Sequence, residues 1–210
     1  MFRLSSIRFL LFTGLLLGAP TVLAARTILV FGDSLSAGYG IRQDAAWPSL
    51  LAKRLQERKL DYSVVNASIS GETTSGGRVR LEDALNKHSP GIVIIALGSN
   101  DGLRGLPVAT MRQNLQAMTD AAQKRKARVL IVGQRLPPNY GPYANQFHQT
   151  FGEVAKARKT AFVEFLLDGV ALTPELFQPD NLHPTAAAQP RLLDNVWRGL
   201  EPLLKQTGTP

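Results

Sequence analysis

Three residues of this chain could together activate a hydroxyl group for attack on a carbonyl carbon: Ser34, Asp180 and His183. A serine hydroxyl is a poor nucleophile until a neighbouring base removes its proton. His183 is the natural base because imidazole titrates near neutral pH. Asp180, three residues earlier, could hold the imidazole in one tautomer and stabilise its cation. The three residues therefore predict acyl transfer through a covalent intermediate on Ser34.

Each of these residues also has a simpler explanation when it is taken alone. Ser34 could cap a helix, because serine is favoured at that position. His183 could be an ordinary surface residue, and Asp180 could be a turn residue. The catalytic interpretation therefore depends on further residues that would have to meet at the same place.

Three hydrogen-bond donors could supply what acyl transfer needs next. The carbonyl oxygen becomes an anion during the reaction and requires preorganised donors. Gly71 could offer its backbone N–H with no side chain in the way, and Asn100 could offer its side-chain amide. The N–H of Ser34 would lie at the start of a helical turn, where free N–H groups point outward. We predict an oxyanion hole formed by Ser34, Gly71 and Asn100.

Short apolar runs alternate with longer helical patterns, and these elements must position the polar residues. The apolar runs cover residues 27–31, 63–65, 92–97, 128–132 and 161–165, and the helical patterns cover residues 47–59, 77–88, 107–126, 143–159 and 185–205. Apolar runs without period-2 alternation are typical of strands buried on both faces of a parallel sheet. The order predicts one three-layer α/β/α domain with a doubly wound, mostly parallel five-stranded sheet.

The polar segments come directly after the predicted strands. Ligands bind outside the carboxyl ends of the strands in such sheets. Ser34, Gly71 and Asn100 follow the first three apolar runs, and Asp180 and His183 precede the last helical pattern. The predicted fold therefore brings the candidate residues to one edge of the sheet.

Four short segments carry a resemblance to a known family. They are GDSLS (32–36), SISGET (68–73), GSND (98–101) and DNLHP (180–184). Each is weak alone, but in this order they resemble the SGNH, or GDSL, hydrolases. The segments WP (47–48), VNASISG (65–71), NDGLRG (100–105) and RLPPNYG (135–141) are similar to those of a bacterial periplasmic group of multifunctional thioesterases, lysophospholipases and arylesterases. The similarity covers essentially the whole chain after its N-terminal segment.

The resemblance implies a flavodoxin-like fold and roles for particular residues. It makes Ser34 the nucleophile, His183 the base and acid, and Asp180 the residue that orients His183. The same three oxyanion donors, Ser34, Gly71 and Asn100, match the family pattern. Ser99 stands where the family more often has glycine, which leaves the Asn100 amide in place. The α/β-hydrolase nucleophile elbow is excluded because Ser36 stands where that motif needs its second glycine.

The resemblance implies acyl-thioesters, aryl esters and lysophospholipids as substrates. The apolar loops after the third and fourth strands should line a groove for the acyl chain, with Leu103, Arg104, Leu136, Pro138 and Tyr140 as substrate-binding residues. Two alternatives remain open. The chain could be a carbohydrate acetylesterase of the same superfamily, which would require a polar, aromatic-lined cleft, or a non-catalytic binding module on this fold.

Several other polar residues are expected to have no catalytic role. Asp33 and Asp101 should hold their loops through hydrogen bonds from side chain to backbone. His88 and His148 match none of the four segments, and no spacing of histidine and acidic residues resembles a metal site. We therefore expect no cofactor and no metal.

The composition and the N-terminus bear on location and partners. Residues 1–24 combine two arginines, an apolar run and small residues before a cleavage point, which predicts a secretory signal peptide followed by a mature domain of residues 25–210. We expect a periplasmic or secreted monomer with no stable membrane insertion after cleavage.

The chain has no cysteine and a formal net charge of +8. Its basic residues are scattered, and the cluster at 124–128 is placed at a helix end, so we expect no nucleic acid partner.

Overall fold

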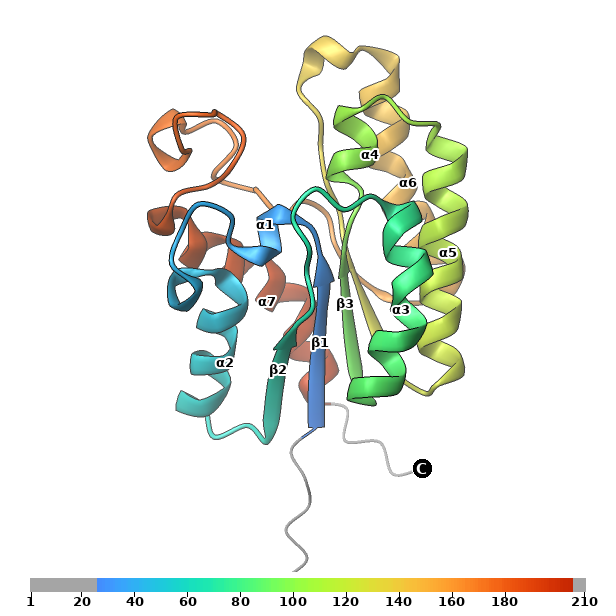
Figure 1. The fold of residues 1–210 in the computed structure, drawn as a ribbon, viewed down its shortest axis with the longest axis vertical. Helices are drawn as coiled ribbons and strands as arrows, with labels where there is room; N and C mark the ends of the chain where they lie inside the picture. Colours follow the sequence, from blue (N-terminus) through green and yellow to red (C-terminus); the bar gives the residue numbers. More distant parts are fainter. Residues whose placement is uncertain (1–25, 206–210) are drawn as a thin grey trace, which may run out of the picture.

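The computed structural model of the protein describes residues 26–205 (Figure 1). The predicted signal segment, residues 1–24, and its cleavage point lie outside the described residues. The strands are β1 (Arg26–Gly32), β2 (Tyr62–Asn66), β3 (Ile92–Ala96), β4 (Arg128–Val132) and β5 (Ala161–Val163). The α-helices are α1 (Ser34–Ala37), α2 (Trp47–Glu57), α3 (Thr74–His88), α4 (Ser99–Leu103), α5 (Val108–Lys124), α6 (Pro142–Arg158) and α7 (Gln189–Lys205). Short 3₁₀ turns cover Gln43–Ala45, Pro138–Tyr140, Pro174–Leu176 and Ala186–Ala188.

The five strands form one sheet in the order β2-β1-β3-β4-β5, and every neighbouring pair is parallel. The predicted doubly wound, flavodoxin-like architecture is confirmed. All strands point the same way, toward α1 and α4 (Figure 1). Because the strand order reverses direction at β1, a crevice forms between the loops that follow β1 and β3, where α/β proteins bind their ligands.

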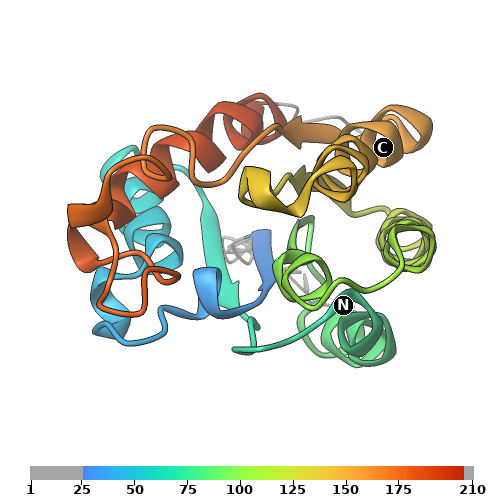
Figure 2. The same ribbon diagram turned by 90° about the horizontal axis from the view of Figure 1, so that it is seen from above.

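Helices cover both faces of the sheet, as the view along the strands shows (Figure 2). Alternate side chains of each central strand point to opposite faces. Ile28 and Val30 of β1 pack with α2 and α7, whereas Leu29 and Phe31 pack with α3, α5 and α6. Strand β3 is buried along its whole length. Burial on both faces explains why these strands appear in the sequence as continuous apolar runs.

Helices α5 and α6 begin within one residue of their predicted starts, whereas α3 and α7 begin three and four residues away. Helix α3 starts at Thr74, three residues before the predicted start, because the Thr73 hydroxyl accepts a hydrogen bond from the Gly76 N–H and caps it. Helix α7 starts at Gln189, not at Thr185. The Thr185 N–H and hydroxyl both donate to the Leu176 carbonyl, so this residue belongs to the preceding loop. Helix α1, with four residues, corresponds to the helical turn predicted at Ser34. Helix α4 was not predicted, because it has only five residues.

None of the helices within residues 26–205 is long and apolar enough to cross a membrane.

Candidate active site

Ser34 is the first residue of α1, directly beyond the end of β1. Asp33 caps this short helix: its Oδ1 accepts a hydrogen bond of 3.1 Å from the Leu35 N–H. The helix ends at Gly38, which has a φ of +74°. The abrupt change from strand to helix leaves the Ser34 side chain half-buried at the carboxyl edge of the sheet.

His183 and Asp180 reach Ser34 from the loop before α7. The His183 Nε2 atom lies 3.0 Å from Ser34 Oγ, and the Nδ1 atom lies 2.7 Å from Asp180 Oδ2. A β-bridge between Phe177 and Pro184 closes the loop at its base. The three candidate residues therefore form one hydrogen-bonded chain, although 149 positions separate Ser34 from His183.

Asp180 organises this loop as well as contacting the imidazole. Its Oδ1 accepts hydrogen bonds from the backbone N–H groups of His183, at 3.0 Å, and Leu182, at 2.9 Å. These hydrogen bonds lower the pKa of Asp180 to about 2, with the His183 backbone N–H as the largest cause and the His183 ring next. The carboxylate is therefore ionised throughout the physiological pH range and can stabilise an imidazolium.

The candidate oxyanion donors come from the loops after β2 and β3. Gly71 lies in a turn closed by the Glu72 N–H and the Ile69 carbonyl, and its φ of +79° requires glycine there. The Asn100 amide donates to the Glu72 carbonyl at 3.0 Å, which leaves its second N–H available. The backbone N–H groups of Ser34 and Gly71 have no acceptor within residues 26–205. Two open backbone donors therefore accompany the Asn100 amide beside Ser34.

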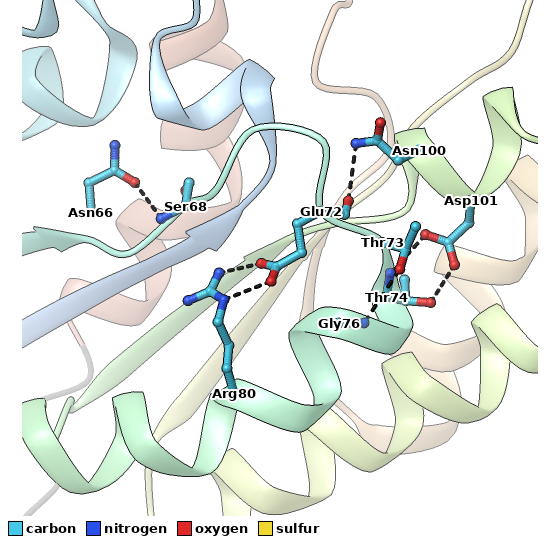
Figure 3. Close-up of polar contacts among 9 residues, drawn as sticks. All are labelled: Asn66, Ser68, Glu72, Thr73, Thr74, Gly76, Arg80, Asn100 and Asp101. Atoms are coloured by element: carbon cyan, nitrogen blue, oxygen red, sulfur yellow. Dashed lines mark hydrogen bonds and ion pairs between the residues drawn. The ribbon is translucent and has the colours of Figure 1, made fainter.

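A buried network holds the two donor loops together (Figure 3). The Asp101 carboxylate accepts from the Thr74 N–H at 2.8 Å and from the Thr74 hydroxyl at 2.6 Å. Glu72 forms an ion pair with Arg80, and this pair is largely buried. Because Asp101 adjoins Asn100 and Thr74 follows the Gly71 turn, these contacts fix the spacing between the two donors. The predicted structural roles of Asp33 and Asp101, through side-chain hydrogen bonds to backbone N–H groups, are confirmed.

Asp33 is fully buried behind Ser34. Burial raises the pKa of Asp33 to about 6, because a charged carboxylate is poorly solvated there. The Leu35 N–H, the Ser99 hydroxyl and the nearby His183 act in the opposite direction but do not cancel this effect. Above about pH 6 the folded protein therefore carries a buried negative charge next to the candidate nucleophile.

Replacing Asp33 by asparagine is expected to stabilise the protein at alkaline pH. The folded-state pKa lies above the ordinary value of 3.8, so the folded protein holds this proton more tightly than the unfolded chain and loses stability as the pH rises from about 3.8 to about 6. The two-unit difference corresponds to about 3 kcal/mol at pH 8. The asparagine Oδ1 can still accept the hydrogen bond from the Leu35 N–H. Chemical unfolding at pH 8 and pH 4 should show a gain that largely disappears at the lower pH.

The exposed Asp120, paired with Arg158, offers a control for this measurement. Asp120→Asn is expected to show no comparable gain at pH 8. Equal unfolding free energies for Asp33→Asn and the wild type at both pH values would contradict the effect of burial.

A cleft of about 870 Å³ opens beside Ser34 and His183. Leu103, Leu136 and Pro138, three of the five predicted substrate-binding residues, line one wall. Arg104 and Tyr140 do not line it. The Arg104 guanidinium donates to the Gly71 carbonyl at 3.0 Å, and the Tyr140 hydroxyl donates to the Leu103 carbonyl at 3.3 Å. Both side chains therefore brace the loops around the cleft.

The opposite wall comes from the segment after β5, which the sequence did not indicate as part of the site. Its apolar residues are Phe165, Leu167, Ala171, Leu172, Phe177 and Leu182. The segment has no helical or alternating pattern, and its one signal is a high content of large apolar residues outside any regular element. Both walls of the cleft are therefore rich in apolar side chains. Its polar lining includes Ser34, Asn100 and His183 and also residues away from them, namely Gln134, Arg135, Asp168, Thr173 and Asn181.

The remaining histidines lie away from this cluster. His148 bonds through Nδ1 to the Gln134 carbonyl at 3.1 Å, and His88 ends α3. No group of three or more histidine or acidic side chains within residues 26–205 could hold a metal ion.

The chain is similar to known hydrolases both in sequence and in structure. Residues 30–190 match the model of the GDSL-like Lipase/Acylhydrolase family. The chain is 50% identical over 182 residues to the esterase TesA of Pseudomonas aeruginosa, covering 86% of this chain and 90% of the relative. It is 40% identical over 182 residues to the thioesterase 1/protease 1/lysophospholipase L1 of Escherichia coli K12, covering 86% of each. The crystal structure of TesA superimposes with a TM-score of 0.83 over 85% of this chain and 99% of the other.

Proposed function

The chain belongs to the GDSL-like lipase/acylhydrolase family and hydrolyses ester and thioester bonds of small-molecule substrates, and we propose that Ser34, His183 and Asp180 are its catalytic triad. The observation that carries this proposal is the continuous hydrogen-bonded chain from Ser34 Oγ to the Asp180 carboxylate, with heavy-atom distances of 3.0 and 2.7 Å. Its position at the floor of an apolar cleft fits an acyl substrate.

Acylation begins with proton transfer from Ser34 Oγ to His183 Nε2 as the oxygen attacks the acyl carbon. Asp180 keeps the Nδ1–H tautomer in place and stabilises the imidazolium that forms. The carbonyl oxygen gains the negative charge and accepts hydrogen bonds from the backbone N–H groups of Ser34 and Gly71 and from the Asn100 amide. The tetrahedral intermediate then collapses: the bond to the leaving group breaks, and the alcohol or thiol departs with the proton from His183.

Deacylation repeats these steps with water. His183 takes a proton from a water molecule, which attacks the acyl-enzyme, and a second tetrahedral intermediate forms at the same donors. Its collapse returns the proton to Ser34 Oγ and releases the carboxylic acid. The same three oxyanion donors thus serve both halves of the reaction.

The walls of the cleft favour a fatty acyl chain over a sugar. Leu103, Leu136 and Pro138 would contact one side of the chain, and Phe165 and Leu172 the other. Burial of each methylene group contributes about 0.8 kcal/mol. A carbohydrate acetylesterase would need polar and aromatic groups along this path. The aromatic residues of the lining are Tyr39, Phe165 and Phe177, and its charged residues besides His183 are Arg135 and Asp168.

We expect kcat/KM to be at least about tenfold higher for p-nitrophenyl octanoate than for the acetate, because the longer chain buries six more carbons. Leu136→Ala should lower the octanoate value about 3- to 10-fold and leave the acetate value within about twofold. Leu106→Ala, outside the cleft lining, is the matched control and should change neither. Acetate hydrolysed faster than octanoate would favour the acetylesterase alternative.

We also propose that the chain is exported with removal of residues 1–24 and acts as a monomeric domain of residues 25–210. The support is the pattern of charged, apolar and small residues at the N-terminus. We propose that it binds no nucleic acid. The support is that several arginines within residues 26–205 pair with acidic side chains, among them Arg54 with Asp194 and Arg125 with Glu82, and paired guanidinium groups offer less positive charge to phosphates.

A further inference from the structure

The ring of Tyr39 lies against the ring of His183. The two ring centroids are 4.4 Å apart, and the planes are tilted by 38°. Tyr39 is about half exposed and stands at the mouth of the cleft. One side of this ring therefore faces the imidazole while the other remains accessible to solvent.

The backbone around Tyr39 holds this contact in place. Gly38 and Gly40 flank it with φ values of +74° and +72°. The Tyr39 N–H donates to the Ser34 carbonyl at 3.3 Å, which ties the turn to α1. The Gln178 amide donates to the Tyr39 carbonyl at 2.8 Å and to the Pro184 carbonyl at 3.1 Å. The turn is thus anchored both to the helix of Ser34 and to the loop of His183.

Gly40 is required for this arrangement on two grounds. A positive φ is unfavourable for other residues. A Cβ atom at Gly40 would also come within 2.1 Å of the Gln178 side chain. The turn therefore depends on close packing against the loop that carries His183, as a dedicated contact would require.

We propose that Tyr39 is a positioning residue that stabilises the protonated form of His183 through the face of its ring. The inference rests on the proposed function, in which His183 becomes an imidazolium in both halves of the reaction. The face of an aromatic ring carries partial negative charge and attracts a cation within about 6 Å. Tyr39 therefore favours the charged imidazole over the neutral one, and so the transition state over the resting enzyme.

The other groups that contact or act on His183 are not themselves substituted in a Tyr39 variant. Ser34 Oγ faces Nε2, Asp180 Oδ2 faces Nδ1, and Asp33 acts on His183 through its charge from below. Any change in the protonation of His183 in a Tyr39 variant can therefore be assigned to the loss of the ring.

Two variants separate the ring face from the hydroxyl and from the volume of the side chain. Tyr39→Phe keeps the face and should retain kcat within about twofold. Tyr39→Leu keeps much of the volume but lacks the face, and it should lower kcat about 3- to 30-fold with a smaller change in KM. The midpoint of the acidic limb of the kcat/KM–pH profile should move to lower pH by about 0.5 to 1.5 in Tyr39→Leu alone.

A measurement without turnover distinguishes failure of this inference from failure of the proposed function. The proton resonances of the His183 ring, followed by NMR in the Ser34→Ala background, report its protonation directly. We expect protonation at lower pH when Tyr39→Leu is added and little change when Tyr39→Phe is added. Identical titration curves for all three proteins, or an equal loss of kcat in Phe and Leu variants, would overturn the inference whatever the role of Ser34.

Discussion

Replacing Ser34 by alanine is expected to lower kcat for p-nitrophenyl octanoate by about 10⁶-fold, to a level set by the remaining donors and the cleft. The change removes the oxygen that would form the acyl-enzyme, while His183, Asp180 and the oxyanion donors remain. Steady-state kinetics on purified protein, with active-site labelling by a fluorophosphonate, measures the effect. Labelling should disappear with the activity, because the same oxygen attacks phosphorus.

The fold should survive this change. Asp33, not Ser34, caps α1, and the hydrogen-bond partner of the Ser34 hydroxyl is His183. We expect the free energy of unfolding to change by about 0.5 kcal/mol or less. Loss of activity together with loss of the folded state would leave the nucleophile unidentified, so thermal unfolding accompanies the kinetics.

Ser36 provides the matched control. It lies two residues further along the same short helix, is fully buried, and its hydroxyl has no hydrogen-bond partner within the described residues. Ser36→Ala should retain labelling and most of the activity. Activity of Ser34→Ala within tenfold of the wild type would refute the assignment and revive the interpretation of this fold as a binding module.

The sequence allowed the edge of the sheet that carries the site to be predicted, for a simple physical reason. Parallel strands end at the same edge, so segments that follow successive strands must converge there. Ser34, Gly71 and Asn100 follow β1, β2 and β3, and their proximity is a consequence of that rule. Apolar runs of strand length identified all five strands. The runs are strongest for β1, β3 and β4, because a strand buried on both faces leaves little choice of side chain.

The cleft wall formed by the segment that follows β5 could not be predicted in this way. Phe165, Leu167 and Leu172 belong to a segment whose conformation depends on contacts with distant elements. A three-residue strand and a 3₁₀ turn impose no periodic pattern on the sequence. The start of α7 was misplaced for a related reason, because the contact of Thr185 with Leu176 belongs to the loop that holds His183.

The contact between Tyr39 and His183 shows a further limit of sequence patterns. Tyr39 lies five residues beyond Ser34, in a segment rich in glycine. Glycine there indicates a turn, but it does not say what the turn approaches. The hydrogen bond from Gln178, 139 residues away, places the turn against the loop of His183, and no local pattern indicates that contact.

Replacing Asp180 by asparagine is expected to lower kcat by about 10³- to 10⁴-fold while leaving the loop intact. The asparagine Oδ1 can still accept from the Leu182 and His183 backbone N–H groups, so the turn keeps its hydrogen bonds. Its amide nitrogen, however, would face His183 Nδ1 and donate to it. The imidazole must then carry its proton on Nε2, where it can no longer accept the proton of Ser34.

The tautomer of the His183 ring tests the orienting role of Asp180 most directly. The ¹⁵N chemical shifts of the His183 ring should indicate the Nδ1–H form in the wild type and the Nε2–H form in Asp180→Asn. Asp44→Asn, which removes an exposed carboxylate paired with Arg42, is the control and should alter neither the tautomer nor kcat. Because the backbone hydrogen bonds persist in Asp180→Asn, a large fall in thermal stability is not expected. A variant with the Nδ1–H tautomer and with kcat within tenfold of the wild type would show that Asp180 does not orient the base, and the proton path from Ser34 would have to end at His183.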